Sequence, residues 1–534
     1  MFLVVVILQA KKIIYSLKEQ LREMHADRII NRSAAFLIAP LISLTLILSG
    51  CGGSVSGGEQ TILTSGTDVS GATFQVNNIS GSDAANGTDE PFQSLQYALN
   101  QLRPGDRLIV QDSGQPYNVS DIVDEAFDAN GDLLKTLRGF KLTTSGTEAL
   151  PIIIEGESTG RPIIDQQQSS SLSGDATLGL LLDCVNHIVI RNFEIRNVNE
   201  AGISSSIKGA CETTNITIED NHIHHVYGEK YVGGIRMMGV SNLLMRDNHL
   251  HDIFSSQSDE DNVLVTNGRG LTNILIENNQ FDALDVGVAI NAQGLGSSTF
   301  ALDRQETVSG IQLSNNVFNN IGSSINLHTS ISDAASSDKI MTGLFSDIDI
   351  YGNVFDQIDS ALVLDTGNSL YPANNICVFN NTIINTLSSS LTLTGVSEME
   401  IFNNIFSMPQ SALLTTNSAT ANASPNSLAY VGNNLFWNYS SLSWRLGNDS
   451  PEDTIYSDLA SWNMASSHPE LQANPDLNTV LADPQFIDPA NADYRLSQAS
   501  PAFSTGRFGL SIGADYNFPE GANLIINACI QRVF

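Results

Sequence analysis

The most regular feature of this chain is a short alternation of apolar and polar residues that ends at an asparagine. Eight segments follow the order apolar-x-apolar-x-x-Asn-x-apolar, and alternation with a period of two is typical of a β-strand with one buried face. A ninth segment, IVIRNFEI (188–195), has Phe193 at the asparagine position. The eight segments are ITIEDNHI (216–223), LLMRDNHL (243–250), ILIENNQF (274–281), IQLSNNVF (311–318), IDIYGNVF (348–355), ICVFNNTI (376–383), MEIFNNIF (399–406) and AYVGNNLF (429–436).

The shared asparagines recur at intervals of 23 to 37 residues. If each repeat is one turn of a solenoid, these side chains stack about 4.8 Å apart, and their amides can hydrogen-bond to one another and to the backbone of the bend. The irregular intervals predict loops of variable length around a constant core. The predicted ladder consists of Asn221, Asn248, Asn279, Asn316, Asn353, Asn381, Asn404 and Asn434.

A second apolar strand follows each of the first six asparagine segments. These second strands are GIRM (234–237), VLVT (263–266), VAIN (288–291), INLH (325–328), LVLD (362–365) and LTLT (391–394). The arrangement resembles the right-handed parallel β-helix of the pectate-lyase-like proteins, over about residues 150–440. A leucine-rich repeat is excluded because the interval is too long and leucine too rare. We therefore expect an all-β chain that forms a right-handed parallel β-helix solenoid.

Both ends of the repeat region resemble the closing elements of bacterial β-helix proteins. Residues 81–110 contain a predicted helix whose apolar face would cover the open end of the first coil. That face consists of Phe92, Leu95, Leu99 and Leu102. Residues 483–506 carry the motifs DP-x-F-x-DP and DYRL…SPA of a closing module. We expect an N-terminal helical cap with the first strands at 73–150, β-helix coils at 151–440 and a C-terminal closing module at 441–534.

The first 50 residues have the character of an export signal. Arg28 and Arg32 precede an apolar run at 34–48, which is short for a membrane span of about 20 residues. The run ends in Leu-Ser-Gly-Cys51, which resembles a bacterial lipobox. That resemblance implies a lipoprotein signal peptide at 1–50, with Met24 as an alternative start, and a lipid on Cys51 that anchors the protein at the outer membrane. Residues 51–72, rich in Gly, Ser and Thr, then form a flexible tether.

Charge restricts the partners of the protein. The 534 residues include 25 basic and 57 acidic ones, a net charge of −32. Without residues 1–50, which hold six of the basic and three of the acidic residues, 19 and 54 remain, a net charge of −35. Such a chain cannot neutralise a run of phosphates, so nucleic acid is excluded as a partner. We expect a monomer that contacts the membrane only through its lipid anchor.

Equivalent positions of successive repeats line up in rows along a solenoid. The row before the bend predicts an alternating ion-pair ladder of Glu219, Arg246 and Glu277. A second row, three residues after the asparagine, reads His224, His251, Asp282, Asn319, Asp356, with the pairs His222/His249 and His225/Asp252 beside it. Stacked His and Asp side chains can bind a metal or exchange protons near neutral pH. The alternative is that these histidines are half-buried polar filler.

The same coils carry an unusual concentration of charge on their loops. Cleavage of a uronate polysaccharide by β-elimination requires a base and a cation that neutralises the sugar carboxylate. Lys230 is the candidate base and Arg236 and Arg269 the candidate neutralisers, with His224 and His251 as further catalytic candidates. The acidic loop at Asp259, Glu260 and Asp261 is a candidate Ca²⁺ site, with a solvated loop as the alternative.

The second strands present a polar row that suits an extended sugar chain. The candidate substrate-binding residues are Asn291, Asn326, His328 and Asp365. A pair of carboxylates for glycoside hydrolysis, at a separation of about 5–9.5 Å, is the other catalytic option. Its candidates are Asp282, Asp285, Asp356, Asp359 and Asp365.

The cysteines give little direct evidence. Cys184 and Cys211 lie one coil apart, where an oxidising compartment would allow a disulfide, but their alignment differs by one residue and favours free thiols. Cys377 and Cys529 show no partner in the sequence.

These patterns lead to two hypotheses of different classes. The first is an extracellular protein that binds and degrades a polysaccharide, by lyase-type β-elimination rather than hydrolysis. The second is a non-catalytic surface adhesin or recognition protein that uses the face of the solenoid as a platform.

Overall fold

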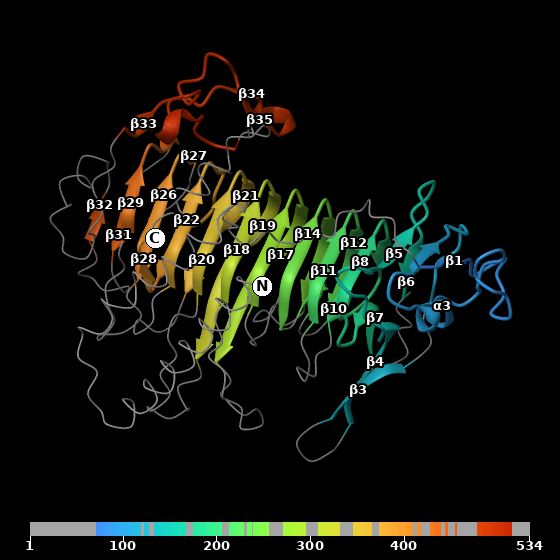
Figure 1. Cartoon of the computed structure of the whole chain (residues 1–534). Coiled ribbons are helices and arrows are strands. Elements are labelled where there is room, and N and C mark those ends of the chain that lie inside the picture. The colour runs from blue at the N-terminus through green and yellow to red at the C-terminus, as the bar shows by residue number, and fades with distance from the viewer. Residues whose placement is uncertain are drawn as a thin grey trace, which may run out of the picture. The chain divides into compact units, whose positions relative to one another are not determined.

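A computed structural model gives the fold of most of the chain (Figure 1). All described residues belong to one compact unit, Ile62–Phe534. The structure describes residues 71–118, 122–127, 133–166, 175–205, 213–228, 232–237, 239–255, 271–294, 308–331, 345–365, 373–408, 414–417, 428–438, 444–446, 454–456 and 478–514.

The chain winds through long sheets of mainly parallel strands. We name sheet A the row that holds the asparagine segments. Each strand of sheet A is hydrogen-bonded to the equivalent strand of the next coil, in parallel register, as in β11 and β14. Its strands are β1 (Thr73–Val76), β2 (Arg107–Val110), β5 (Ile152–Gly156), β8 (Asn186–Arg191), β11 (Thr213–Glu219), β14 (Val240–Arg246), β16 (Leu271–Glu277), β18 (Val308–Ser314), β20 (Phe345–Tyr351), β22 (Ala373–Phe379), β25 (Val396–Ser397), β26 (Met399–Phe402) and β29 (Leu428–Gly432).

Sheet B follows sheet A around each coil, directly after the asparagine bend. Its first strands are β6 (Ile163–Asp165), β9 (Glu194–Arg196), β12 (His222–Gly228), β15 (His249–Ser255), β17 (Gln280–Gly294), β19 (Val317–Ile331) and β21 (Val354–Asp365). Towards the C-terminal end it continues as β23 (Thr382–Ile384), β24 (Leu391–Thr394), β27 (Ile405–Ser407), β28 (Leu414–Asn417), β30 (Leu435–Trp437), β31 (Trp444–Leu446), β32 (Thr454–Tyr456) and β33 (Val480–Leu481).

Sheet C completes the first coils. Its strands are β3 (Ile122–Phe127), β4 (Leu133–Leu142), β7 (Asp175–Leu182), β10 (Ala201–Ser205) and β13 (Gly233–Arg236). Because strands of successive coils pair in parallel while the chain moves from sheet to sheet within a coil, the molecule is a parallel β-helix, as the sequence predicts.

The apolar positions of the strands fill the interior of the coils. In the motif Asn-x-Phe, the phenylalanine two residues after the ladder asparagine points inward, and Phe281, Phe318 and Phe355 stack with centroids 4.9 Å apart in each pair. All three are at most 2 % exposed. One aromatic ring per coil at the same position therefore links the coils through a continuous stack.

The ladder asparagines are hydrogen-bonded to one another through the core. In Asn279, both the backbone N–H and Nδ2 donate to Oδ1 of Asn316, at 2.9 and 3.1 Å, and Nδ2 also donates to the carbonyl of Met245. The same pattern runs from Asn221 to Asn434, and every member is at most 1 % exposed. At the ninth position, Phe193 keeps only the backbone donation to Asn221.

The residue before each ladder asparagine turns the corner in a left-handed conformation. Asp220, Asp247, Asn278 and Asn315 have φ between 52° and 57°, and Gly352 has φ 67°. Asn, Asp and Gly tolerate this region best, which explains the recurring Asp-Asn and Asn-Asn pairs. A further left-handed corner, four residues after each ladder position, is occupied by His225 and Asp252 among others.

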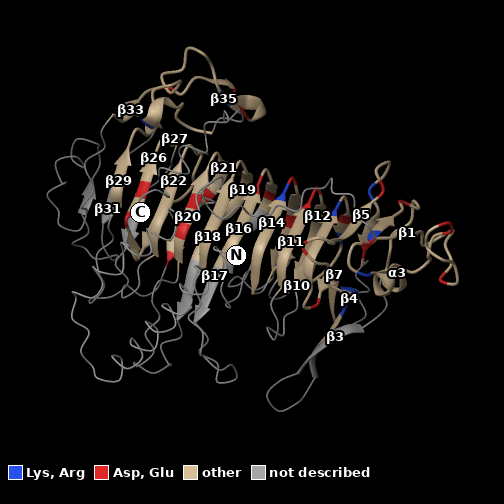
Figure 2. Cartoon of the chain, in the orientation of Figure 1, with Lys and Arg blue, Asp and Glu red and all other residues tan. Residues whose placement is uncertain are grey.

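The predicted ion-pair ladder is present on the outer face of sheet A (Figure 2). Glu219 accepts hydrogen bonds from Arg191 Nη1 at 3.2 Å and from Arg246 Nε at 2.8 Å, and Arg191 Nε also donates to Glu155 at 2.6 Å. Glu277 lies opposite Arg246 in register. In later coils the same row becomes aromatic, with Tyr351, Phe379 and Phe402 stacked.

The N-terminal helix is where the sequence places it. Helix α3 (Leu95–Gln101) lies between β1 and β2 along the chain. Phe92, Leu95, Leu99 and Leu102 are at most 3 % exposed and join the main hydrophobic core. The apolar face of the helix therefore closes the core at its N-terminal end.

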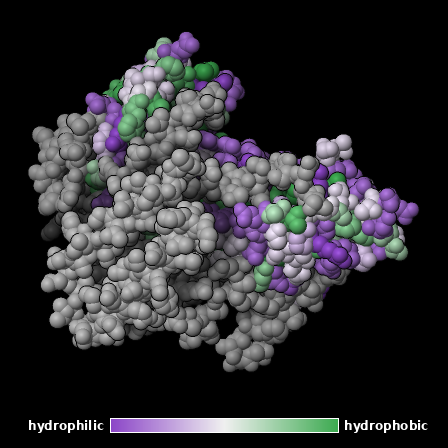
Figure 3. All heavy atoms as spheres, viewed as in Figure 1, coloured by the Kyte–Doolittle hydropathy of each residue, from purple (hydrophilic) through white to green (hydrophobic). Residues whose placement is uncertain are grey.

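The C-terminal segment packs along the side of the last coils. After β33 the chain forms an antiparallel hairpin, β34 (Phe486–Asp488) with β35 (Asp493–Leu496). Tyr494 donates to Asp356, and Asn380 donates to the carbonyl of Ser511 at 2.6 Å. Figure 3 shows hydrophobic atoms on the outer surface of this segment, which includes the exposed Leu481, Ile487, Phe503 and Phe508.

Two cysteines correct the interpretation of the sequence. Cys184 and Cys377 are each disulfide-bonded, so the expectation of a free thiol at Cys184 and of no partner for Cys377 is wrong. Five strands of sheet A separate β8 from β22, a span of roughly 29 Å that excludes a bond between the two. Their partner sulfurs lie outside the described residues, as do Cys211 and Cys529.

Candidate functional site

Five histidines gather on the outer face of sheet B. The parallel register of β12 and β15 places His222 opposite His249 and His224 opposite His251. His225 follows His224 at the left-handed corner. These residues, His222, His224, His225, His249 and His251, are called the histidine cluster below. The cluster forms because the asparagine bends of two successive coils are in register and each is followed by His-x-His.

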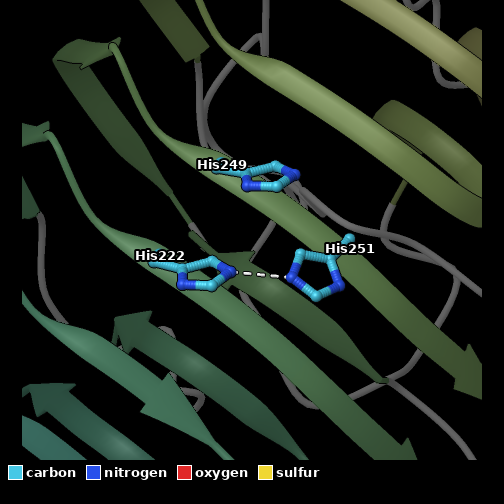
Figure 4. A group of neighbouring side chains, drawn as sticks. All are labelled: His222, His249 and His251. Atoms are coloured by element: carbon cyan, nitrogen blue, oxygen red, sulfur yellow. Dashed lines mark hydrogen bonds between the residues drawn. The ribbon is translucent and has the colours of Figure 1, made fainter.

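The rings of the cluster are in direct contact (Figure 4). Nε2 of His222 and Nε2 of His251 are 2.7 Å apart, and the rings of His222 and His249 stack with centroids 5.1 Å apart at 5°. His224 stacks on His251 at 4.8 Å, and its Nδ1 lies 2.5 Å from Nδ1 of His225. The imidazoles thus form one continuous network rather than separate fillers of the surface.

Carboxylates flank the cluster on three sides. Asp252 Oδ2 lies 2.8 Å from Nδ1 of His251, and Asp282 Oδ2 lies 3.0 Å from Nε2 of His249. Glu194, from the preceding coil, lies 3.3 Å from Nε2 of His224. A carboxylate at one ring nitrogen fixes the tautomer of the histidine and directs the other nitrogen elsewhere.

The environment keeps the central imidazole neutral. Burial, together with the neighbouring His224, His249 and His251, lowers the pKa of His222 to about 4. Burial also lowers the pKa of His224, against the opposing effect of Glu194. Burial raises the pKa of Asp282, but hydrogen bonds from His249, Gln280 and Asn319 outweigh it and hold that pKa below its usual value. The site therefore offers neutral imidazole nitrogens at His222 and His224 beside the ionised carboxylate of Asp282.

The local positive charge is already paired. Arg196 stands next to His224 in register, but its Nε donates to Asp165 and its Nη1 to Glu194, each at 2.7 Å. Among the described residues, a cation that enters the site would therefore meet the carboxylates of Asp252 and Asp282, whose partners are histidines. Two sets of side chains could hold one: His222, His249 and His251, whose ligand atoms all lie within 4.8 Å of one another, and Glu194, His222 and His224.

An aromatic pair lies just beyond the corner of the cluster. Tyr227 and Phe254 are opposite in register, and their rings stack in parallel with centroids 6.0 Å apart at 6°. Tyr227 is 39 % exposed, and His225 meets its ring edge-on at 5.9 Å. Two parallel rings next to polar groups, of which Tyr227 is exposed and Phe254 partly buried, suit the apolar face of a sugar ring.

The row of side chains that contains His224 and His251 continues along sheet B, and at its far end the C-terminal segment covers it. His251, Asp282, Asn319 and Asp356 follow one another in register, as the sequence predicts. Asp356 is 7 % exposed and accepts hydrogen bonds from Tyr494 at 2.5 Å and Asn385 at 2.8 Å. Asp356 therefore holds the C-terminal segment and does not face a substrate.

Arg236, predicted to neutralise a substrate carboxylate, is instead buried in an ion pair. Its guanidinium donates to Glu200 Oε1 at 2.6 Å, and the residue is 5 % exposed. This buried ion pair occupies the guanidinium, so Arg236 is not available to neutralise a substrate carboxylate. Lys230, Arg269, the acidic loop at Asp259, Glu260 and Asp261, and the lipidation candidate Cys51 lie outside the described residues.

The second-strand row is partly in register. Asn291, His328 and Asp365 pair in succession across β17, β19 and β21. Asn326 lies two residues earlier and pairs with Val363. Three of the four candidate substrate-binding residues therefore share one row and Asn326 belongs to its neighbour.

The sequence pattern gave no indication of three contributors to the site. Glu194 and Arg196 come from the segment with Phe193 in place of the ladder asparagine, which obscured their register with the histidines. The Tyr227–Phe254 pair lies after the left-handed corner. Positions in the sequence were aligned by their offset from the ladder asparagine, and that alignment was not carried beyond the corner. Alignment of the coils on that corner, at His225 and Asp252, would have indicated the pair.

Comparisons with known proteins give structural likeness only. No family model matches the chain, and no curated protein matches it. A GH136 lacto-N-biosidase from Eubacterium ramulus is 15 % identical and has a TM-score of 0.45, with 77 % of this chain and 67 % of that one covered. A pectate lyase is 14 % identical, with a TM-score of 0.43 and coverage of 85 % and 98 %.

A PL6 family polysaccharide lyase from Pseudopedobacter saltans is 12 % identical, with a TM-score of 0.42 and coverage of 79 % and 98 %. In the part of the chain that the structure describes, no helix has the length and hydropathy to cross a membrane. The sheets themselves establish that the chain is a parallel β-helix.

Proposed function

We propose that this protein binds a polysaccharide along the outer face of sheet B and cleaves it at the histidine cluster. The observation that carries the proposal is the pairing of two partly exposed imidazoles with carboxylates on one open face, His249 with Asp282 and His251 with Asp252. Such pairs accept and donate protons near neutral pH. The Tyr227–Phe254 pair supplies an adjacent surface for a sugar ring.

The reaction that fits this site best is β-elimination. A neutral imidazole takes the proton from the carbon next to the sugar carboxylate, the electron pair forms a carbon–carbon double bond, and the glycosidic oxygen leaves and takes up a proton. The products are a shortened chain and a chain with an unsaturated terminal sugar. The low pKa of His222 and the carboxylate-oriented His251 agree with a base that is unprotonated at neutral pH.

A substrate panel tests the proposal directly. The protein is incubated with alginate, pectate and glycosaminoglycans, and both ultraviolet absorbance and new reducing ends are measured. A lyase gives both signals, and a hydrolase gives only reducing ends. His251→Gln should abolish product formation, whereas His187→Asn, at a remote left-handed corner of sheet A, should leave it unchanged.

A second function from a different class is a non-catalytic recognition protein. The aromatic pair of Phe254 and the exposed Tyr227 favours it, because sugar binding needs no proton transfer. Retention of one polysaccharide in a pull-down, with no product from any polymer, would establish recognition and refute cleavage. Tyr227→Ala should weaken binding under either function.

We also propose that the protein is held at the cell envelope by a lipid on Cys51. The support is the basic and apolar leader that ends in Leu-Ser-Gly-Cys51. Metabolic labelling with a fatty-acid analogue should mark the wild-type protein and not the Cys51→Ser variant. Equal labelling of both proteins would refute the anchor.

A further inference from the structure

We infer that His222, His249 and His251 form a binding site for one Zn²⁺ ion. The three side chains come from two neighbouring strands and lie side by side on the face of sheet B, with His222 and His251 facing each other (Figure 4). One ring nitrogen of each lies within 4.8 Å of the others. Three imidazoles with space for a water ligand are a recurrent zinc site in enzymes.

The contact between His222 and His251 requires only a small adjustment for the ion, and the nitrogen of His249, within 4.8 Å of both, has to move closer. Zinc binds imidazole nitrogen at about 2.0–2.1 Å, so two nitrogens on a tetrahedral ion are about 3.3 Å apart. The Nε2 atoms of His222 and His251 are 2.7 Å apart. A slight rotation of either partly exposed ring would open the gap between the two nitrogens.

The carboxylates around the rings are placed as second-layer partners of a metal site. Asp252 engages Nδ1 of His251 at 2.8 Å, so Nε2 of the same ring, which lies 2.7 Å from Nε2 of His222, is the nitrogen directed to the metal. Asp282 engages Nε2 of His249 at 3.0 Å in the same way. Metal-bound histidines usually donate their other nitrogen to such a carboxylate, and these partners raise the affinity.

The other candidate set is less suitable. His224 has both ring nitrogens engaged, Nδ1 with His225 at 2.5 Å and Nε2 with Glu194 at 3.3 Å. Glu194 also accepts a hydrogen bond from Arg196 at 2.7 Å. A metal at Glu194, His222 and His224 would have to displace all of these contacts, including the ion pair with Arg196. A metal at His222, His249 and His251 would replace only the contact between Nε2 of His222 and Nε2 of His251, and the carboxylate partners would stay in place.

The chemistry of the ligands selects the kind of ion. Neutral imidazoles suit Zn²⁺ and similar transition-metal ions, whereas Ca²⁺ binds oxygen ligands. The proposed site is thus distinct in residues and in ion type from the acidic loop considered for calcium in the sequence.

The site has a consequence for cleavage that rests on the proposed function. The paired Arg196 leaves the described part of the site without an available cation, and β-elimination needs one to stabilise the sugar carboxylate. A zinc ion would supply that charge. Water on its open position, whose pKa zinc lowers to about 7, would then replace a free imidazole as the base.

Metal binding is measured without any polysaccharide, so its outcome is independent of the proposed function. The full chain is stripped with a chelator and titrated with Zn²⁺ by calorimetry, and bound metal is quantified after dialysis. One ion per chain is expected, with no competition from excess Ca²⁺. Substitution by Co²⁺ should give the intense visible bands of a tetrahedral site with nitrogen ligands.

Variants identify the ligands. His249→Gln and His251→Gln should each weaken binding about 100-fold or more, and Asp252→Asn about 10-fold. His187→Asn should bind as the wild type does, and circular dichroism verifies that each variant is folded. Absence of stoichiometric zinc in the wild type would refute the site. Loss of binding in His224→Gln but not in His251→Gln would also refute it and assign the ion to the set with Glu194.

Discussion

Replacement of one ladder asparagine should test how the coils are held together. Asn316 is 0 % exposed and lies in the middle of the ladder. Its Oδ1 accepts from the N–H and Nδ2 of Asn279, and its Nδ2 donates to the carbonyl of Ile276 and to Oδ1 of Asn353. Asn316→Ala removes all four hydrogen bonds and leaves the N–H of Asn279 without its acceptor.

The expected cost follows from those four contacts. A hydrogen bond contributes about 1 kcal/mol net, and a buried donor without a partner costs about 1–3 kcal/mol. Three bonds at about 1 kcal/mol each, together with the unpaired donor, should therefore lower the free energy of unfolding by about 4–6 kcal/mol, a large part of the stability of a typical domain. Because each coil contacts only its neighbours, the loss should be concentrated in the coils of β16 to β21.

Urea unfolding followed by circular dichroism measures the loss, and hydrogen exchange locates it. The matched control is Asn320→Gly, an exposed asparagine with φ 54° where glycine fits without strain. This control should change the free energy of unfolding by less than about 1 kcal/mol. A change of less than about 1 kcal/mol in Asn316→Ala as well would refute the reasoning that the ladder stabilises the fold.

Three further predictions concern contacts outside the ladder. Asp356→Ala removes the acceptor of Tyr494 and should make the C-terminal segment more sensitive to limited proteolysis, and an unchanged cleavage rate would show that other contacts hold the segment. Glu219→Gln removes the carboxylate charge between Arg191 and Arg246 and should lower the free energy of unfolding by about 2 kcal/mol at low salt and by less at high salt. An equal loss at low and high salt would count against an electrostatic cause. Under non-reducing, denaturing conditions Cys184 and Cys377 should resist alkylation until a reductant is added, and immediate labelling of either would contradict its disulfide.

Much of the coil could be predicted from local sequence because its determinants are local. Alternation fixes which side chains point inward, and the asparagine at a constant offset fixes the bend, so the register of Asn279 on Asn316 follows. The same regularity predicted that His224, His251 and Asp282 share a row. Side chains at equivalent offsets must align once the strands pair in parallel.

Contacts between irregular parts of the chain could not be predicted in this way. The closure of Asp356 by Tyr494 joins residues 138 positions apart, and the pairing of Arg236 with Glu200 depends on how two loops of different length return to sheet C. Cys184 and Cys377 likewise formed disulfides that their spacing in the sequence did not indicate.

The sequence by itself therefore determined the parallel β-helix, its asparagine ladder and the row of histidines, because each repeat carries the same short-range pattern. Only the tertiary structure decided which residues of that row are partly exposed, that Asp252 and Asp282 orient the imidazoles, and that one ring nitrogen of each of three histidines lies within 4.8 Å of the others. These properties depend on the orientation of the rings and on segments from other coils. Packing of the side chains, and not spacing along the chain, sets such interatomic distances to within a few tenths of an ångström.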